Sequence, residues 1–258
     1  MIFCGCSLSP HGFTLIVING CSIENILEIN EEFCTEVRIF DNNEKYNPIS
    51  KFINSYEDYN LILKEFNDKR WNMYCGVNRR SKKTKLMKEI ENRKLFYFDV
   101  ENFDKKPPYS DTKNYNELKK YTKFVINLLE DIYNLKLCTI ITTGRGLSIY
   151  YKFVDIPIKL ENNFKKYIKN IFKFIKNIHN NYNELDKYET LKKYKIYFEK
   201  EIFTKFKCWD SVIDSSRING LIGSINTKYP EQPLREIIYL NTKYINDINN
   251  KLKNVNIT

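Results

Sequence analysis

The chain has 258 residues, of which 42% are hydrophobic, so it is long and apolar enough for one large folded domain or two small ones and is not a disordered segment. Its net charge of +10, with 19 tyrosines and 17 phenylalanines among the cations, suits a polyanion such as nucleic acid, although an AT-rich genome would encode the same bias. No apolar run reaches the length of a membrane span and the N-terminus lacks a secretory signal pattern, so we expect a cytoplasmic protein with no membrane partner.

The first third of the chain alternates strand and helix patterns. Residues 13–18 and 36–40 predict strands, and residues 23–33 predict a helix between them. A second helix is expected over residues 56–66 and a third strand over residues 74–77. The pattern therefore indicates an N-terminal α/β unit.

The seven cysteines are odd in number and lack the paired CxxC spacing of a zinc ribbon, which favours free thiols. Cys4, Cys6, His11 and Cys21 lie within one short segment, and a small zinc-binding knuckle there is the alternative. The other histidine, His179, ends a lysine-rich helix, where its ordinary role is to stabilise the helix C-terminus. The two histidines therefore predict no catalytic pair.

An acidic pair stands in the apolar run LFYFDVE at residues 95–101, which follows a basic loop at residues 76–83. A strand alternates its side chains, so Asp99 and Glu101 share one face while Val100 points to the other. Two carboxylates this close repel each other, and a divalent cation between them removes the repulsion. The pair predicts a metal site, with two solvated acids at a strand end as the alternative.

A glycine-flanked turn follows an amphipathic helix whose apolar face carries Leu118, Tyr121, Val125, Leu128, Leu129 and Ile132. Residues 138–151 predict a strand, a turn at Gly144-Arg145-Gly146 and a second strand. The glycines let the backbone approach a phosphate closely, whereas a plain tight turn with a solvated arginine is the alternative. Two further helices are expected over residues 160–178 and 183–199.

The last informative segment is WDSVIDSSRINGLIGSINTK at residues 209–228. A DxE strand, a GRG hairpin turn, and an acid followed by valine, arginine and an LxGSxN-K tail occur in this order along the chain. In combination they resemble the archaeo-eukaryotic primase superfamily, over about residues 71–228. The chain is similar to the catalytic domain of a primase-polymerase of the plasmid, viral or defence-associated kind.

The resemblance implies an α+β class and the archaeo-eukaryotic primase fold. In that fold a modified RNA-recognition-like sheet bears the active site next to an N-terminal α/β module. Residues 1–258 would then form a single primase-polymerase catalytic domain, with the N-terminal module at 1–70 and the active-site module at 71–258.

The resemblance also implies roles for individual residues. Asp99, Glu101 and Asp210 match the metal-binding carboxylates of the family. Asp214 is the alternative to Asp210. The residues expected to bind the nucleotide or its phosphates are Arg79, Thr143, Gly144, Arg145, Gly146, Ser148, Arg217 and Lys228.

The implied function is template-directed transfer of nucleotides from (d)NTPs to a 3′-hydroxyl by a DNA primase-polymerase, with or without de novo priming, with Mg²⁺ or Mn²⁺ in a two-metal site. The expected partners are a single-stranded DNA template, nucleoside triphosphates and a helicase or accessory domain. The alternative is a catalytically degenerate module that binds nucleotide or single-stranded DNA for replication initiation. A metal-dependent nuclease comes third, because it would not explain the arginine-bearing turn and the GSxN-K tail together.

The sequence departs from the family pattern at two places. Ser148 stands where the family has a histidine that contacts phosphates, and a serine hydroxyl carries no charge. Gly220 stands where the family has an arginine, and Ile222 replaces a proline. We expect both losses to weaken triphosphate binding while they leave the metal ligands intact.

Overall fold

The computed structural model describes residues 34–41, 46–83, 90, 92–102, 112–144, 146–189, 192, 200–209, 213, 217–229, 232–241 and 243–253. The strand and helix predicted at residues 13–18 and 23–33, and the segment from Cys4 to Cys21, lie outside these residues. Within them, free thiols are confirmed for four buried cysteines, Cys34, Cys75, Cys138 and Cys208.

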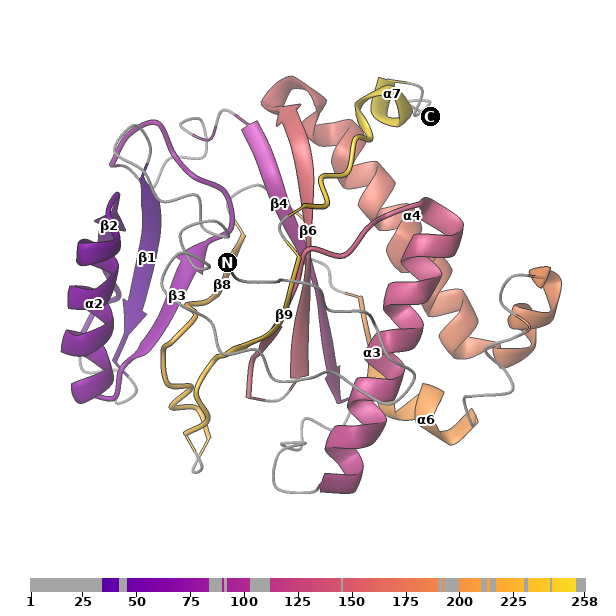
Figure 1. The fold of residues 1–258 in the computed structure, drawn as a ribbon, viewed down its shortest axis with the longest axis horizontal. Helices are drawn as coiled ribbons and strands as arrows, with labels where there is room; N and C mark the ends of the chain where they lie inside the picture. The colour runs from indigo at the N-terminus through magenta and orange to yellow at the C-terminus, as the bar shows by residue number, and fades with distance from the viewer. Residues whose placement is uncertain are drawn as a thin grey trace, which may run out of the picture.

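Two antiparallel sheets lie side by side (Figure 1). The first contains, in spatial order, β2 (Ile49–Ile53), β1 (Thr35–Phe40), β3 (Asn72–Gly76) and β8 (Ile218–Gly220). Helix α2 (Tyr56–Asp68) packs on it through Tyr59, Ile62 and Phe66. The helix begins at Ser55, whose side chain accepts a hydrogen bond from the Asp58 amide at 3.0 Å. Two strands of this sheet therefore come from the chain after residue 70.

The second sheet contains, in spatial order, β7 (Phe206–Lys207), β4 (Asn92–Asn102), β6 (Gly146–Pro157), β5 (Thr139–Thr142) and β9 (Ile237–Leu240). Helices α3 (Thr112–Tyr133) and α4 (Glu161–Asn180) cover the face turned away from the first sheet (Figure 1). The apolar side predicted for α3 is confirmed, because its residues pack into the core under this sheet.

The other helices in the described residues are short: the 3₁₀ helices η3 (Ile158–Leu160) and η4 (Tyr182–Lys187), and α6 (Lys200–Lys205) and α7 (Asn249–Lys253). The α-helix predicted over residues 183–199 is wrong at its start, because η4 occupies that segment. Tyr182 and Leu185 are three residues apart and both pack on the core, which is the spacing that a 3₁₀ helix places on one side. None of the described helices combines the length and apolarity of a membrane span.

Strand β4 divides its side chains between two cores. Phe96, Phe98 and Val100 pack with α3 and α4. Leu95 and Tyr97 point the opposite way, into the core formed with the first sheet and α2. From Leu95 onward, after a register shift between Arg93 and Leu95, the odd-numbered positions of β4 therefore face the first sheet.

A buried ion pair ties the start of β4 to the start of α4. Arg93 Nη2 lies 2.8 Å from Glu161 Oε1, and the two side chains are only 2% and 9% exposed. The guanidinium also lies 4.5 Å from the ring centre of Phe164. Glu161 stands in the first helical turn, where the helix dipole favours a carboxylate.

Replacing Glu161 with alanine should lower the free energy of unfolding by about 3–5 kcal/mol, because the Arg93 charge would stay buried without its carboxylate. Urea denaturation measures this loss. As a control, Glu65→Ala breaks the exposed Lys69–Glu65 pair and should cost at most about 1 kcal/mol. Equal losses in the two variants would contradict the importance of the buried pair.

Candidate active site

Asp99 and Glu101 lie on the face of β4 that is turned toward the first sheet. Their neighbours on β4, Phe98 and Val100, pack on the opposite side against the helices. Asp99 pairs with Ser148 of β6, and Glu101 pairs with Gly146. Both carboxylates are partly exposed to solvent. The structure thus brings the acidic pair together beside the glycine-flanked turn, as the alternation of the strand predicts.

Ser148 contacts the first carboxylate directly. Its Oγ donates a hydrogen bond to Asp99 Oδ1 at 3.0 Å, and its side chain is fully buried. A buried donor fixes the orientation of the carboxylate that accepts from it. At this position the chain therefore has a residue that orients Asp99.

Lys207 contacts the second carboxylate. It lies on β7 directly opposite Glu101, and its Nζ is 2.7 Å from Glu101 Oε1. Strand β7 is only two residues long, so the local sequence has no alternating pattern that would indicate a contact between Lys207 and Glu101. Sequence reasoning therefore missed this residue of the site.

The turn between β5 and β6 depends on its glycines. A Cβ atom on Gly146 would lie 2.0 Å from the carbonyl oxygen of Val100, so the backbones of β6 and β4 approach each other more closely than any side chain allows. Gly144 has φ +101°, a conformation that L-residues rarely adopt. The Gly146 amide donates to Thr143 Oγ1 at 3.1 Å, and Arg145 lies outside the described residues.

The LxGSxN-K segment is attached to this turn. The Asn226 side chain donates to the Thr143 carbonyl. Thr142 Oγ1 donates at 3.2 Å to the carbonyl of Leu234, which itself pairs with Ile225 of the segment. Lys228, in the same segment, is exposed and holds its Nζ 5.4 Å from the ring centre of Tyr74. The structure therefore places the predicted lysine on the segment that contacts the turn.

Arg217 joins the two sheets next to the acidic pair. Its guanidinium carbon lies 4.1 Å from the ring centre of Tyr97, two residues before Asp99 on the same face of β4. Its carbonyl accepts from the Val77 amide at 3.0 Å, and the residue is 7% exposed. A guanidinium over an aromatic ring is stabilised by the electron density of that ring.

The two arginines of the basic loop have different environments. Arg80 is buried, and its Nη2 lies 2.8 Å from Glu36 Oε2. Arg79 is partly exposed. Of the two arginines, Arg79 is therefore the one whose side chain is accessible to solvent.

The missing side chain at Gly220 makes room for Arg235. A Cβ atom on Gly220 would lie 2.2 Å from Arg235 Nε. The Arg235 guanidinium is 5.2 Å from the Tyr74 ring centre, and its Nη1 donates to Ser224 Oγ at 2.6 Å and to the Ile225 carbonyl at 3.1 Å. Burial lowers the pKa of this arginine. The chain thus carries a cation close to Gly220, but the cation comes from a distant position that the sequence pattern did not reveal.

Two other groups near the acidic pair are held neutral. Burial raises the pKa of the Tyr150 hydroxyl well above its usual value, and the neighbouring Cys75 and Tyr97 add to the rise. Burial also raises the pKa of the Cys208 thiol, and the nearby Asp99 carboxylate adds to it. A neutral phenol and thiol are poor nucleophiles and bases, so neither group is a catalytic candidate.

The chemistry of the acidic pair fits Mg²⁺ or Mn²⁺, because carboxylate oxygens are the ligands that these cations prefer. The Lys207 ammonium group already contacts one oxygen of Glu101. Asp210 and Asp214 lie outside the described residues. Within the part of the chain that the structure describes, no three His, Cys, Asp or Glu side chains gather into a group that could hold a metal.

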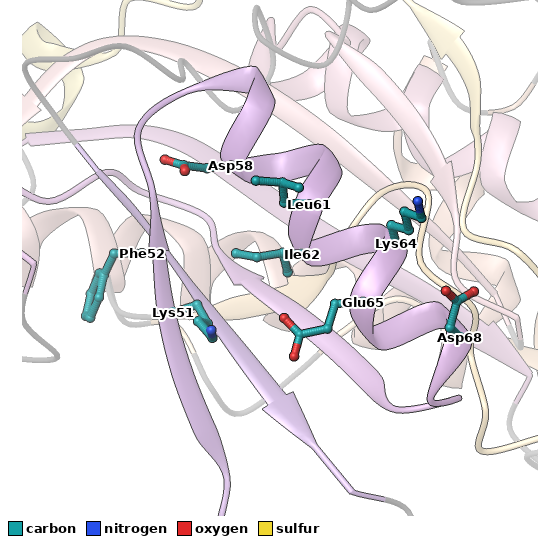
Figure 2. Close-up of a pocket in the computed structure, with 8 residues that line it drawn as sticks. All are labelled: Lys51, Phe52, Asp58, Leu61, Ile62, Lys64, Glu65 and Asp68. Atoms are coloured by element: carbon teal, nitrogen blue, oxygen red, sulfur yellow. The ribbon is translucent and has the colours of Figure 1, made fainter.

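A separate pocket of about 540 Å³ lies between β2 and α2 (Figure 2). Its lining mixes charged and apolar side chains, among them Lys51, Phe52, Leu61 and Glu65. None of the predicted site residues lines it. The acidic pair is therefore not part of this pocket.

The chain matches no protein-family model and no curated protein sequence. Among solved structures it is similar to the AEP domain of the primase-polymerase (PrimPol) of cyanophage S-2L, with a TM-score of 0.51, 11% identity, and coverage of 92% of this chain and 97% of that chain. Two structures of primase RepB' have TM-scores of 0.49 and 11% identity. In one, its catalytic domain in complex with initiator DNA, 90% of this chain aligns with 90% of that chain. In the other, 90% of this chain aligns with 60% of that chain. The likeness to the cyanophage domain shows the fold, so the predicted α+β archaeo-eukaryotic primase fold is confirmed.

Replacing Gly146 with alanine should destabilise the protein by about 1–3 kcal/mol, because the new Cβ would collide with the Val100 carbonyl and push β6 away from β4. Chemical denaturation measures the change. Gly76→Ala is the matched control in a strand, since the nearest atom to its Cβ would be at 3.6 Å, an ordinary contact. If the two variants were equally stable, the close approach at Gly146 would not constrain the sheet.

Gly220→Ala should also destabilise the protein by about 1–3 kcal/mol, here through collision with the Arg235 side chain. Shortening that side chain removes the collision, so the cost of Gly220→Ala should fall markedly in an Arg235→Ala background. A double-mutant cycle of unfolding free energies measures this coupling. Purely additive effects would contradict the assignment of that space to Arg235.

Proposed function

We propose that this chain, which has the fold of an archaeo-eukaryotic primase domain, is a nucleotidyltransferase that adds nucleotides from (d)NTPs to a 3′-hydroxyl on a single-stranded DNA template. The observation that carries the proposal is the pairing of Asp99 with Ser148 and of Glu101 with Gly146. This register sets two carboxylates, whose hard oxygens suit a divalent cation, beside the glycine-flanked turn that we propose to contact a phosphate. Nucleoside triphosphates and template DNA are the proposed ligands, and a helicase or accessory domain is a proposed partner.

In the proposed reaction, the 3′-hydroxyl oxygen bonds to the α-phosphorus of the incoming nucleotide. The hydroxyl proton is lost to solvent and the bond to pyrophosphate breaks. Asp99 and Glu101, with Asp210 as the third ligand, would hold Mg²⁺ or Mn²⁺, which lowers the pKa of the hydroxyl and neutralises charge on the leaving group. No covalent bond to the protein forms.

The residues around the acidic pair have distinct tasks in this proposal. Ser148 keeps Asp99 in one orientation through its hydrogen bond. Arg217 and the exposed Lys228 offset the negative charge of the triphosphate, with Arg145 and Arg79 as additional contacts. Gly144 and Gly146 lack side chains, which lets the backbone of the turn come close to a phosphate. Together these groups hold the α-phosphorus near the bound hydroxyl.

The second candidate is a domain that binds nucleotide and single-stranded DNA without turnover. Two observations favour it: Lys207 already occupies one oxygen of Glu101, and a buried serine stands where the family has a histidine. However, a domain that only binds a polyanion gains nothing from two carboxylates, because they repel phosphates. We therefore place the enzyme first.

Replacing Asp99 with alanine should reduce synthesis more than about 100-fold, since loss of a metal ligand costs more than loss of a group that merely orients one. The measurement is incorporation of labelled nucleotides on a single-stranded template with Mg²⁺ or Mn²⁺, with and without a primer. Glu101→Ala should behave in the same way. Asp131→Ala, which removes an exposed acid of α3, is the control.

Binding of the template strand to the same variants separates the two candidates. Asp99→Ala should keep the affinity for single-stranded DNA, because the cations and aromatic rings remain. A wild-type protein that binds DNA but makes no product under any metal condition would refute the enzyme and favour the binding domain.

A further inference from the structure

A lysine stands at the place where the proposed function puts a metal ion. Lys207 lies opposite Glu101 in the antiparallel pair of β7 and β4, so the two side chains share one face of the sheet. Lys207 Nζ is 2.7 Å from Glu101 Oε1, and the side chains of the two residues are 26% and 32% exposed. Asp99 lies two residues before Glu101 on the same face. The ammonium group is therefore a direct neighbour of the carboxylate pair.

The ammonium and a divalent cation compete for this carboxylate. A metal ion that binds Glu101 must displace Lys207 from Oε1 or share the carboxylate with it. In either case the lysine charge stays close to the metal. Coulomb repulsion between a unit charge and a divalent charge about 5 Å apart weakens binding by about tenfold, even in a medium as polar as water.

A bound triphosphate shifts this competition for Glu101 from the ammonium group to the metal ion. Its oxygens carry several negative charges and accept hydrogen bonds from an ammonium group. The Lys207 side chain is 26% exposed, so its ammonium group can turn from Glu101 toward such an acceptor without unfolding β7. The metal ion would then find Glu101 released and the opposing charge neutralised.

We propose that Lys207 is a positioning residue that makes metal binding depend on the nucleotide: it holds Glu101 when the site is empty and moves to the phosphates when a metal-bound nucleotide arrives. The inference rests on the proposed function, since it assumes that Glu101 is a metal ligand. By thermodynamic linkage, the factor by which nucleotide tightens metal binding equals the factor by which metal tightens nucleotide binding. Lys207 raises that factor.

The test is a titration of the purified chain with Mn²⁺, with free Mn²⁺ followed by electron paramagnetic resonance. Each titration is run without nucleotide and with a nonhydrolysable deoxynucleoside triphosphate analogue. Lys207→Gln should bind Mn²⁺ about tenfold more tightly than wild type in the absence of nucleotide. The factor by which the nucleotide analogue increases the Mn²⁺ affinity should be about tenfold smaller in Lys207→Gln than in wild type.

Lys205→Gln is the matched control. It removes the same charge two residues away, from a lysine that pairs with Glu117 at 2.6 Å and does not contact Glu101. Its Mn²⁺ affinity should equal that of wild type. Lys207→Arg keeps the charge and should bind Mn²⁺ as wild type does. Lys207→Met also removes the charge, should behave as Lys207→Gln, and covers the case in which Lys207→Gln does not fold.

Unchanged Mn²⁺ affinity in Lys207→Gln, or an equal gain in Lys205→Gln, would overturn the inference. Such a result together with metal-dependent synthesis by wild type would leave the proposed function standing. Absence of Mn²⁺ binding in every variant, with and without nucleotide, would overturn both.

Discussion

The close approach of β6 to β4 is the constraint on which the site depends. Gly146 lies so near the Val100 carbonyl that no other residue fits there without moving a strand. This contact fixes the register in which Glu101 faces Gly146 and Asp99 faces Ser148. The acidic pair, the serine that orients it and the glycine-flanked turn are therefore consequences of one backbone contact, and they would be displaced together if it were lost.

Charge is compensated locally around this contact. Lys207 balances Glu101 on one side, and the Arg217 guanidinium lies over the Tyr97 ring on the other. Arg235 is buried against neutral oxygens and the Tyr74 ring, at a cost in desolvation that its lowered pKa reflects. Unlike Lys207, Arg217 is already held by its ring contact, and a cation fixed in this way needs little rearrangement when a phosphate arrives, which favours transition-state stabilisation.

Local periodicity was sufficient for the parts of the fold that are long and regular. The alternation of LFYFDVE places the two acids on one face, and the spacing of Leu118, Tyr121 and Val125 gives the buried side of α3. It failed where contacts join distant segments. The contact of Lys207 with Glu101 spans a two-residue strand, and Arg235 fills the space over Gly220 from the far end of a loop, so neither leaves a repeating pattern in the sequence. The helix predicted at residue 183 failed because tertiary packing of Tyr182 and Leu185 selects a tighter 3₁₀ turn.

The central claim is that the register of β4 and β6 builds a metal site for nucleotidyl transfer. Crystals of the chain grown with Mn²⁺ and a nonhydrolysable deoxynucleoside triphosphate would test it by anomalous diffraction at the manganese edge. The account predicts an anomalous peak within coordination distance of both Asp99 and Glu101, with the triphosphate against the turn at Gly144 and Gly146. A triphosphate bound elsewhere, or a manganese ion that contacts neither carboxylate, would contradict it.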